Sequence, residues 1–222
     1  MSSFQESGFE FLLDFFSFDE MIDVYKEISP VELGSLSGGF RNAEKKFSSI
    51  HKLVNSTKLL KKAQDYLNGK PNVVRVILFN KSLKNNWMVP WHQDCTVAVS
   101  KKFDLNSWGP WSIKDGDYHV QPPLECLNDM VTFRIQIDDA TIENGSLRIL
   151  PNSHRFGFMT SEEINYYVKH YPFVSCELKS GSILAMRPLL LHSSPKTKVN
   201  TNRKIIHIEF SSYQLPNGIN WA

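Results

Sequence analysis

A histidine and an aspartate stand two residues apart in the stretch "PWHQDCTVAV" (residues 90–99), where an alternating apolar run begins. Side chains at positions i and i+2 of a β-strand point to the same face, so His92 and Asp94 can converge on one point. A divalent metal ion bound by both is one interpretation. A salt bridge or a hydrogen-bonded pair is the other, and the motif alone favours it because H-x-D is short and arises by chance in many chains.

A metal site needs a further protein ligand, and His192 is the first candidate. It follows an apolar run and precedes "SSP" (residues 193–195), which places it at the end of a strand. Two histidines and one carboxylate on one face of an iron ion form the facial triad of non-haem iron(II) oxygenases. Arg203 begins another apolar strand, and its guanidinium suits bidentate binding of a cosubstrate carboxylate. Its neighbour Lys204 points to the opposite strand face.

Helices are expected in the first third of the chain, where they would support these residues. Residues 17–29 carry the capping-box pattern of Ser17 and Glu20, followed by helix-spaced apolar positions. Residues 55–69 have the pattern of a second helix, with Gly69 as its C-terminal stop.

Strands are expected in the rest of the chain, in six short segments rich in β-branched or aromatic residues. These are "NVVRVILF", "CTVAVS", "MVTFRIQID", "SLRILP", "SILAMRP" and "RKIIHIEFS". Residues 101–128 are expected to form one long active-site loop, and residues 159–173 a short helix. The chain is therefore expected to be a single α+β domain over 1–222, with mainly helical support in 1–70 and a barrel or sandwich core in 71–222.

Composition limits the functions to consider. The 222 residues are 41% hydrophobic and 22% charged, which is ordinary for a soluble protein. The net charge of +2 does not suggest a nucleic-acid partner, and no apolar run approaches the length of a membrane span. Cys95, Cys126 and Cys176 are odd in number and far apart, so we expect free thiols and a cytoplasmic location.

The sequence resembles the phytanoyl-CoA dioxygenase (PhyH-like) family of iron(II)/2-oxoglutarate-dependent oxygenases over nearly its whole length. Four segments carry the resemblance: "SGFEFLLDFFSFDEM", "WHQD", "DDATIENGSLRILPNSHRFG", and "LLLHSS" with Arg203. The third is similar to the family's D-x-x-x-x-N-G-x-L-x-x-x-P-G-S-H stretch, with Asn152 where glycine is usual.

This resemblance implies a double-stranded β-helix, a jelly-roll or cupin-like barrel with the N-terminal helices packed on one sheet. It implies iron(II) ligands at His92, Asp94 and His192. It also implies that 2-oxoglutarate forms a salt bridge with Arg203 and that dioxygen is the second cosubstrate.

Further cosubstrate contacts are implied by the positions that touch it in relatives. These are Gln93, the spacer of H-x-D, and Ser194, two residues after the distal histidine. A polar residue on the strand before H-x-D often does so too, and Arg75 is the candidate. A buried arginine must find an acceptor, and Glu209 or Asp138 could serve as well as a ligand would.

Other candidates lie near these motifs. Trp108 and Trp111 fall in the expected loop and are interpreted as stacking near the cosubstrate or closing the pocket, with simple packing within the loop as the alternative. His154 is expected to hold a turn or line the pocket edge, and His207 to be a satisfied core histidine or to lie near the site.

One strand leaves its orientation open. Thr132, Arg134 and Gln136 share one face of it, and the other face is apolar. The polar face is the substrate wall if it looks into the barrel, and a solvated surface if it looks outward.

The expected reaction is hydroxylation of an unactivated C–H bond of a small-molecule substrate, with release of succinate and CO2. Asp94 argues against halogenation, because related halogenases replace this carboxylate with a small residue, while desaturation or cyclisation stay open. Two alternatives remain. A cupin-like metalloenzyme that does not use 2-oxoglutarate needs no Arg203, and a non-catalytic β-barrel binding module needs neither the triad nor the arginine.

Overall fold

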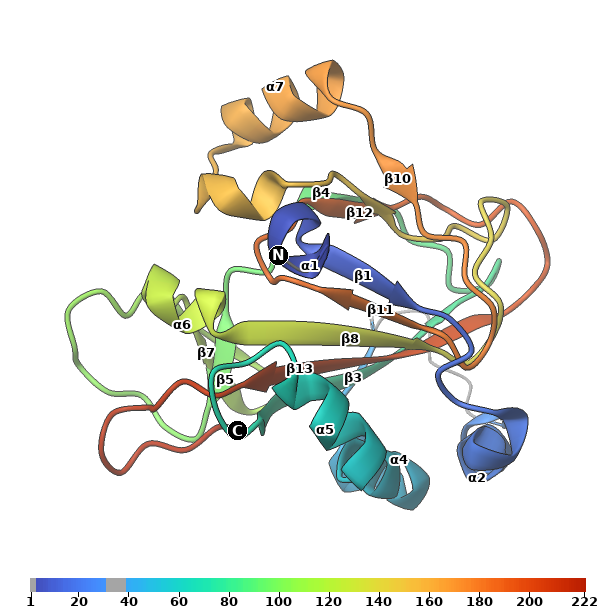
Figure 1. Cartoon of the computed structure of the whole chain (residues 1–222), viewed down its shortest axis with the longest axis horizontal. Coiled ribbons are helices and arrows are strands. Elements are labelled where there is room, and N and C mark those ends of the chain that lie inside the picture. The colour runs from blue at the N-terminus through green and yellow to red at the C-terminus, as the bar shows by residue number, and fades with distance from the viewer. Residues whose placement is uncertain (1–2, 31–38) are drawn as a thin grey trace.

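The computed structural model describes residues 3–30 and 39–222 and combines helices with antiparallel sheets (Figure 1). The helices are α1 (Ser3–Ser7), α2 (Phe18–Ile28), α3 (Ala43–Lys46), α4 (Ser48–Val54), α5 (Thr57–Gln64), α6 (Leu124–Asn128) and α7 (Ser161–His170), with a 3-10 turn η1 at Ser153–Phe156. Within the described ranges, none of the helices combines the length and apolar character needed to cross a bilayer.

The largest sheet has the strand order β1-β11-β8-β13-β3-β2. Its strands are β1 (Phe9–Leu12), β2 (Phe40–Arg41), β3 (Asn72–Lys81), β8 (Met130–Gln136), β11 (Ile183–Met186) and β13 (Arg203–Ser211). All its pairs are antiparallel. The register sets Arg203 opposite Lys81 and His207 opposite Arg134, so residues far apart in sequence meet on one face.

A second sheet has the order β10-β9-β12-β4. Its strands are β4 (Val89–His92), β9 (Arg148–Ile149), β10 (Val174–Ser175) and β12 (His192–Ser194). In Figure 1 these strands lie above the larger sheet, with η1 and α7 on their outer side. A cavity between the two sheets is lined from both.

The side chains of the large sheet divide between a core and this cavity. The helices α2, α4 and α5 pack on one face through a buried apolar cluster. Along β8 the apolar positions join that cluster, whereas Thr132, Arg134 and Gln136 alternate to the opposite face and are at most 8% exposed. The polar face of this strand is therefore buried and not solvated, and of its three side chains only Arg134 lines the cavity.

Local signals explain where the first helices begin and end. Ser17 and Glu20 form the expected capping box of α2. The prediction that Gly69 ends the second helix was wrong, because α5 ends at Gln64. The next backbone N–H groups, starting with Asp65, bond three residues back, so the last turn tightens and Tyr66 enters the core.

The prediction of one continuous loop over 101–128 was also wrong. A third sheet with the order β5-β7-β6 runs through it, built from β5 (Val97–Val99), β6 (Trp111–Lys114) and β7 (Asp117–Val120), and α6 follows. Asp115 and Gly116 both have positive φ (51° and 92°), the conformation of a two-residue hairpin turn for which Asp-Gly is a strong signal.

Candidate active site

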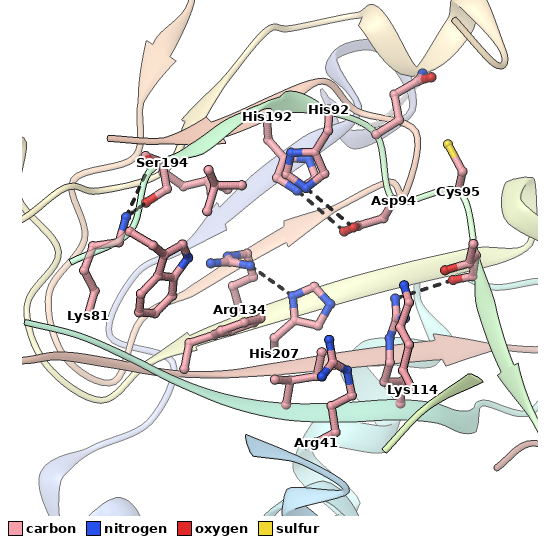
Figure 2. Close-up of a pocket in the computed structure, with 18 of the residues that line it drawn as sticks. Arg41, Lys81, His92, Asp94, Cys95, Lys114, Arg134, His192, Ser194 and His207 are labelled. Atoms are coloured by element: carbon pink, nitrogen blue, oxygen red, sulfur yellow. Dashed lines mark hydrogen bonds and ion pairs between the residues drawn. The ribbon is translucent and has the colours of Figure 1, made fainter. Parts of the chain in front are cut away.

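The two histidines of the expected triad face each other across neighbouring strands (Figure 2). His92 ends β4 and His192 begins β12; they are paired in register, and their ring centroids lie 4.1 Å apart. Asp94 lies just beyond the end of β4, where its backbone N–H donates to the Pro188 carbonyl over 2.9 Å. The Nε2 atoms of His92 and His192 lie 3.8 Å and 3.6 Å from the Asp94 carboxylate oxygens.

Each imidazole is held through its Nδ1 atom. His92 Nδ1 lies 2.9 Å from the Pro90 carbonyl oxygen, and His192 Nδ1 lies 2.8 Å from that of Leu190. A carbonyl can only accept, so Nδ1 carries the proton and Nε2 keeps a free lone pair. Burial lowers the pKa of His192 to about 3, which keeps this ring in its neutral, metal-binding form.

The donor set fits iron(II). The three ligand atoms lie within 4.8 Å of one another, and Asp94 Oδ2 is buried without a hydrogen-bond partner. Burial by itself raises the pKa of Asp94, but the nearby imidazoles, His192 first, and the Arg75 guanidinium outweigh it and hold that pKa below its usual range. A buried carboxylate oxygen that lacks a partner is costly unless a cation binds it, and two imidazoles with one carboxylate are the iron facial triad.

A cationic end of the cavity lies beside this triad. Lys81 Nζ is 2.6 Å from Ser194 Oγ and 2.6 Å from the Pro195 carbonyl oxygen, and Arg203 Nη2 is 3.2 Å from the same Ser194 Oγ. Burial lowers the pKa of Lys81 to about 7 and that of Arg203 to about 9, with Arg134 adding repulsion to both. We refer to Lys81, Ser194 and Arg203 as the basic end.

The turn of the "ENGSL" segment supports the basic end. Arg203 Nε donates to the Asn144 carbonyl over 3.3 Å, and Ser194 Oγ donates to the Gly145 carbonyl over 2.9 Å. A Cβ at Gly145 would lie 2.5 Å from the Pro195 carbonyl oxygen, so only glycine allows this close approach. Further along the same segment, Asn152 replaces the family's usual glycine at a φ of 68°, a left-handed conformation that asparagine tolerates.

Arg75 lines the cavity, and Glu209 satisfies it. The two side chains form a buried ion pair, whereas Asp138 accepts from the Lys204 backbone N–H instead. Glu209 also lies 3.0 Å from His207 Nε2, and Arg134 donates to His207 Nδ1 over 3.0 Å. His207 is therefore both satisfied and in the cavity wall.

Two of the expected cosubstrate contacts are engaged elsewhere. Gln93 lines the cavity, but its amide donates to the Gly157 and Leu189 carbonyls and accepts from the Met159 N–H, so it ties loops together. Trp108 packs against Phe103, with ring centroids 5.0 Å apart, in an apolar cluster under the third sheet.

The expected pocket role of the loop aromatics was therefore wrong. Neither Trp108 nor Trp111 is in the cavity wall, because the segment folds as a hairpin on its own core. His154 also lies outside this cavity, in a smaller hollow beside Arg187, with its Nδ1 buried and unpartnered.

The cavity residues missed from sequence include three cations, Arg41, Lys81 and Lys114, and one tryptophan, Trp87. Lys81 carried a usable signal, since it lies six residues after Arg75 on β3 and therefore on the same strand face. No local sequence signal pointed to Arg41, Trp87 or Lys114, because they come from edge strands and a connecting loop. Together with the expected residues they enclose about 420 Å³.

Known structures share this fold. One is the non-haem epimerase SnoN from nogalamycin biosynthesis, in complex with Fe3+, alpha ketoglutarate and nogalamycin RO. It is 14% identical with a TM-score of 0.70, covering 95% of this chain and 81% of that chain. HygX from Streptomyces hygroscopicus, with nickel and 2-oxoglutarate bound, is 14% identical with a TM-score of 0.68, covering 94% and 84%. The carbocyclase SnoK is 13% identical with a TM-score of 0.68, covering 94% and 81%.

No curated protein matches the chain. The family model described as phytanoyl-CoA dioxygenase (PhyH) matches residues 4–205, nearly the whole sequence. This match confirms the resemblance drawn from the sequence motifs, and with it the class of enzyme and its dependence on iron and 2-oxoglutarate. The chain belongs to the phytanoyl-CoA dioxygenase family and is an iron(II)/2-oxoglutarate-dependent oxygenase.

Proposed function

We propose that this enzyme hydroxylates an unactivated C–H bond of a small-molecule substrate with dioxygen as the oxidant, one oxygen atom entering the product and the other entering succinate as 2-oxoglutarate loses CO2. One observation carries the proposal: the free Nε2 lone pairs of His92 and His192 and the orphaned carboxylate oxygen of Asp94 converge in a cavity that also contains Arg203. That combination supplies three metal ligands and a counter-charge for the cosubstrate.

The roles of the individual residues follow from their contacts. His92, Asp94 and His192 would hold the iron on one face and leave its other positions open. The bound metal and cosubstrate supply the oxidising chemistry, while the protein supplies binding and orientation. Retention of the Asp94 carboxylate supports hydroxylation over halogenation.

The basic end would orient the cosubstrate. Arg203 offers a planar pair of donors for the distal carboxylate of 2-oxoglutarate, and Ser194 Oγ already bridges it to Lys81. The side chains of Phe79, Trp87 and Leu147 add apolar wall to the cavity and exclude water from the reacting atoms.

The strand connectivity supports a double-stranded β-helix. The core strands β3, β8, β11 and β13 lie in the large sheet, and β4, β9, β10 and β12 in the smaller one. Consecutive strands mostly alternate between the two sheets, as in a jelly roll. We propose that residues 1–222 act as one such domain, in the cytoplasm, where the free thiols of Cys95, Cys126 and Cys176 stay reduced.

Anaerobic titration with iron(II) and then 2-oxoglutarate tests the proposal. A weak visible charge-transfer band is expected only when both are bound. A metalloenzyme that does not use 2-oxoglutarate would bind iron without giving the band, and a non-catalytic binding module would bind neither, so either result would overturn the proposal.

A metabolite-extract screen scored by substrate-dependent succinate formation would then find the substrate. Mass spectrometry of the product tests the reaction type, because hydroxylation adds one oxygen atom to the carbon skeleton. A product that has lost hydrogen without gaining oxygen, or that has only changed configuration, would contradict hydroxylation.

A further inference from the structure

The cavity has a large excess of positive charge. Among the described residues, six basic side chains line it but only one acidic side chain, Asp94. The basic residues are Arg41, Arg75, Lys81, Lys114, Arg134 and Arg203. A cavity lined mostly by one sign of charge concentrates ions of the opposite sign, so we expect anionic groups to bind in it when the enzyme works.

Part of the excess is accounted for by partners already assigned. Arg75 forms its buried ion pair with Glu209. Lys81 Nζ and Arg203 Nη2 both contact Ser194 Oγ, so these two cations lie side by side, and repulsion from Arg134 adds to burial in lowering the pKa of each. The distal carboxylate of 2-oxoglutarate would supply negative charge at this end.

Arg41 and Lys114 are the cations of the cavity to which no such partner is assigned. Figure 2 shows Lys114 at the opposite side of the cavity from Lys81 and Ser194, with Arg41 below the centre and the metal triad above. Arg41 belongs to β2, an edge strand of the large sheet, and Lys114 to β6, an edge strand of the third sheet. Two separate sheets therefore bring basic side chains to this part of the wall.

Neither residue is neutralised within the described chain. Lys114 is exposed, and no carboxylate oxygen lies within 4.0 Å of its Nζ in residues 3–30 and 39–222. Arg41 Nη1 contacts Asp115 at 3.1 Å, but the Asp115 side chain is 55% exposed, and such surface pairs contribute little. Arg41 Nε is buried without a hydrogen-bond partner. Burial, then Arg75 and Arg41, lower the pKa of Lys114, so these cations repel one another.

We infer that the substrate carries an anionic group, a carboxylate, phosphate or sulfate, that Arg41 and Lys114 bind on the side of the cavity away from the basic end. The inference rests on the proposed function, because it assumes that the triad binds the metal and that the basic end binds 2-oxoglutarate. The reacting carbon then lies between the anionic group and the triad, so the two cations would select substrates by charge and by length.

Titration with small anions tests this site directly. Protein loaded with iron(II) and saturating 2-oxoglutarate under nitrogen is titrated calorimetrically with inorganic phosphate, acetate or neutral acetamide, while the charge-transfer band is recorded. We expect phosphate, acetate or both to bind without loss of the band, and acetamide not to bind. Whichever anion binds more tightly identifies the preferred class of anionic group.

Variants locate the binding. Arg41→Gln and Lys114→Gln should each weaken anion binding at least tenfold and leave 2-oxoglutarate affinity unchanged. Lys179→Gln removes the same charge from a side chain that is 79% exposed and outside the cavity, and should have no effect. No anion binding in the parent, equal weakening in Lys179→Gln, or anions that bind only by displacing 2-oxoglutarate would each overturn the inference.

The charge-transfer band distinguishes a failure of this inference from a failure of the proposed function. If the band never forms, the proposed function fails, and the inference about its substrate fails with it. If the band forms normally but neither cavity variant changes anion binding, only the inference about the substrate is wrong.

Discussion

The two charged regions of the cavity are built in different ways. At the basic end, Arg203 and Lys81 are 5% and 1% exposed, and neighbouring carbonyl groups and Ser194 Oγ fix their positions. Arg41 and Lys114 come from edge strands and are more exposed. A buried, preorganised cation binds its partner at little cost in ordering, whereas an exposed one is screened and loses side-chain entropy. The basic end therefore suits a constant cosubstrate, and the Arg41–Lys114 side suits an adjustable contact with substrate.

The largest effect is expected for a variant that loses the metal, because both charged regions are proposed to hold molecules that react there. His192→Ala should weaken iron(II) affinity by more than the roughly 10- to 100-fold that loss of a mere supporting hydrogen bond causes. Succinate formation should stop while the fold is retained. Iron content and anaerobic titration measure this, with His154→Ala, outside the cavity, as the control. Succinate formation in His192→Ala at the parental rate would contradict the triad.

Arg203→Ala should have the next largest effect. In the proposed binding mode, this change leaves the distal carboxylate of 2-oxoglutarate without its partner in a desolvated pocket, a loss of about 2–5 kcal/mol. That corresponds to roughly thirty- to several-thousand-fold in affinity. Lys204→Ala is the matched control, because Lys204 Nζ donates to the Ser29 carbonyl on the other face of β13. Equal weakening in both variants would show that Arg203 has no special role.

The pH dependence of 2-oxoglutarate binding should report Lys81. Its pKa is lowered by burial to about 7, so the ammonium form predominates below pH 7 and is lost above it. Affinity should therefore fall as the pH rises above 7, by at most about tenfold per pH unit because one proton is linked. Lys81→Met should flatten this part of the profile, measured by anaerobic titration. A parental slope in the variant would exclude Lys81 as its source.

Ligand binding at the two charged regions should differ in its dependence on ionic strength, and this is the smallest of the expected effects. The screening length falls from about 30 Å at 0.01 M salt to about 8 Å at 0.15 M. Over this range, the affinity of Arg41 and Lys114 for phosphate or acetate should fall roughly several-fold, while the affinity for 2-oxoglutarate changes less. Calorimetry at both salt concentrations measures the difference. A steeper salt dependence for 2-oxoglutarate would reverse the comparison.

The parts of the site that local motifs encode were predictable. H-x-D places His92 and Asp94 within reach of one point, and strand alternation puts Arg203 and Lys204 on opposite faces. The capping box of Ser17 and Glu20 also formed as expected. In the segment 101–128, the Asp-Gly pair at 115–116 is a local hairpin signal, and it predicts the strands β6 and β7 that keep Trp108 out of the pocket.

The sequence by itself determined the types of the candidate ligands, their strand-end positions and the family, because these depend on neighbouring residues and on motif order. Only the tertiary structure decided which face of β8 looks inward, that Glu209 is the partner of Arg75, and that Arg41 and Lys114 share a cavity with the triad. The physical reason is that a strand's two faces are equivalent until packing buries one of them. Contacts between strands of separate sheets depend on register and twist, which no local pattern records.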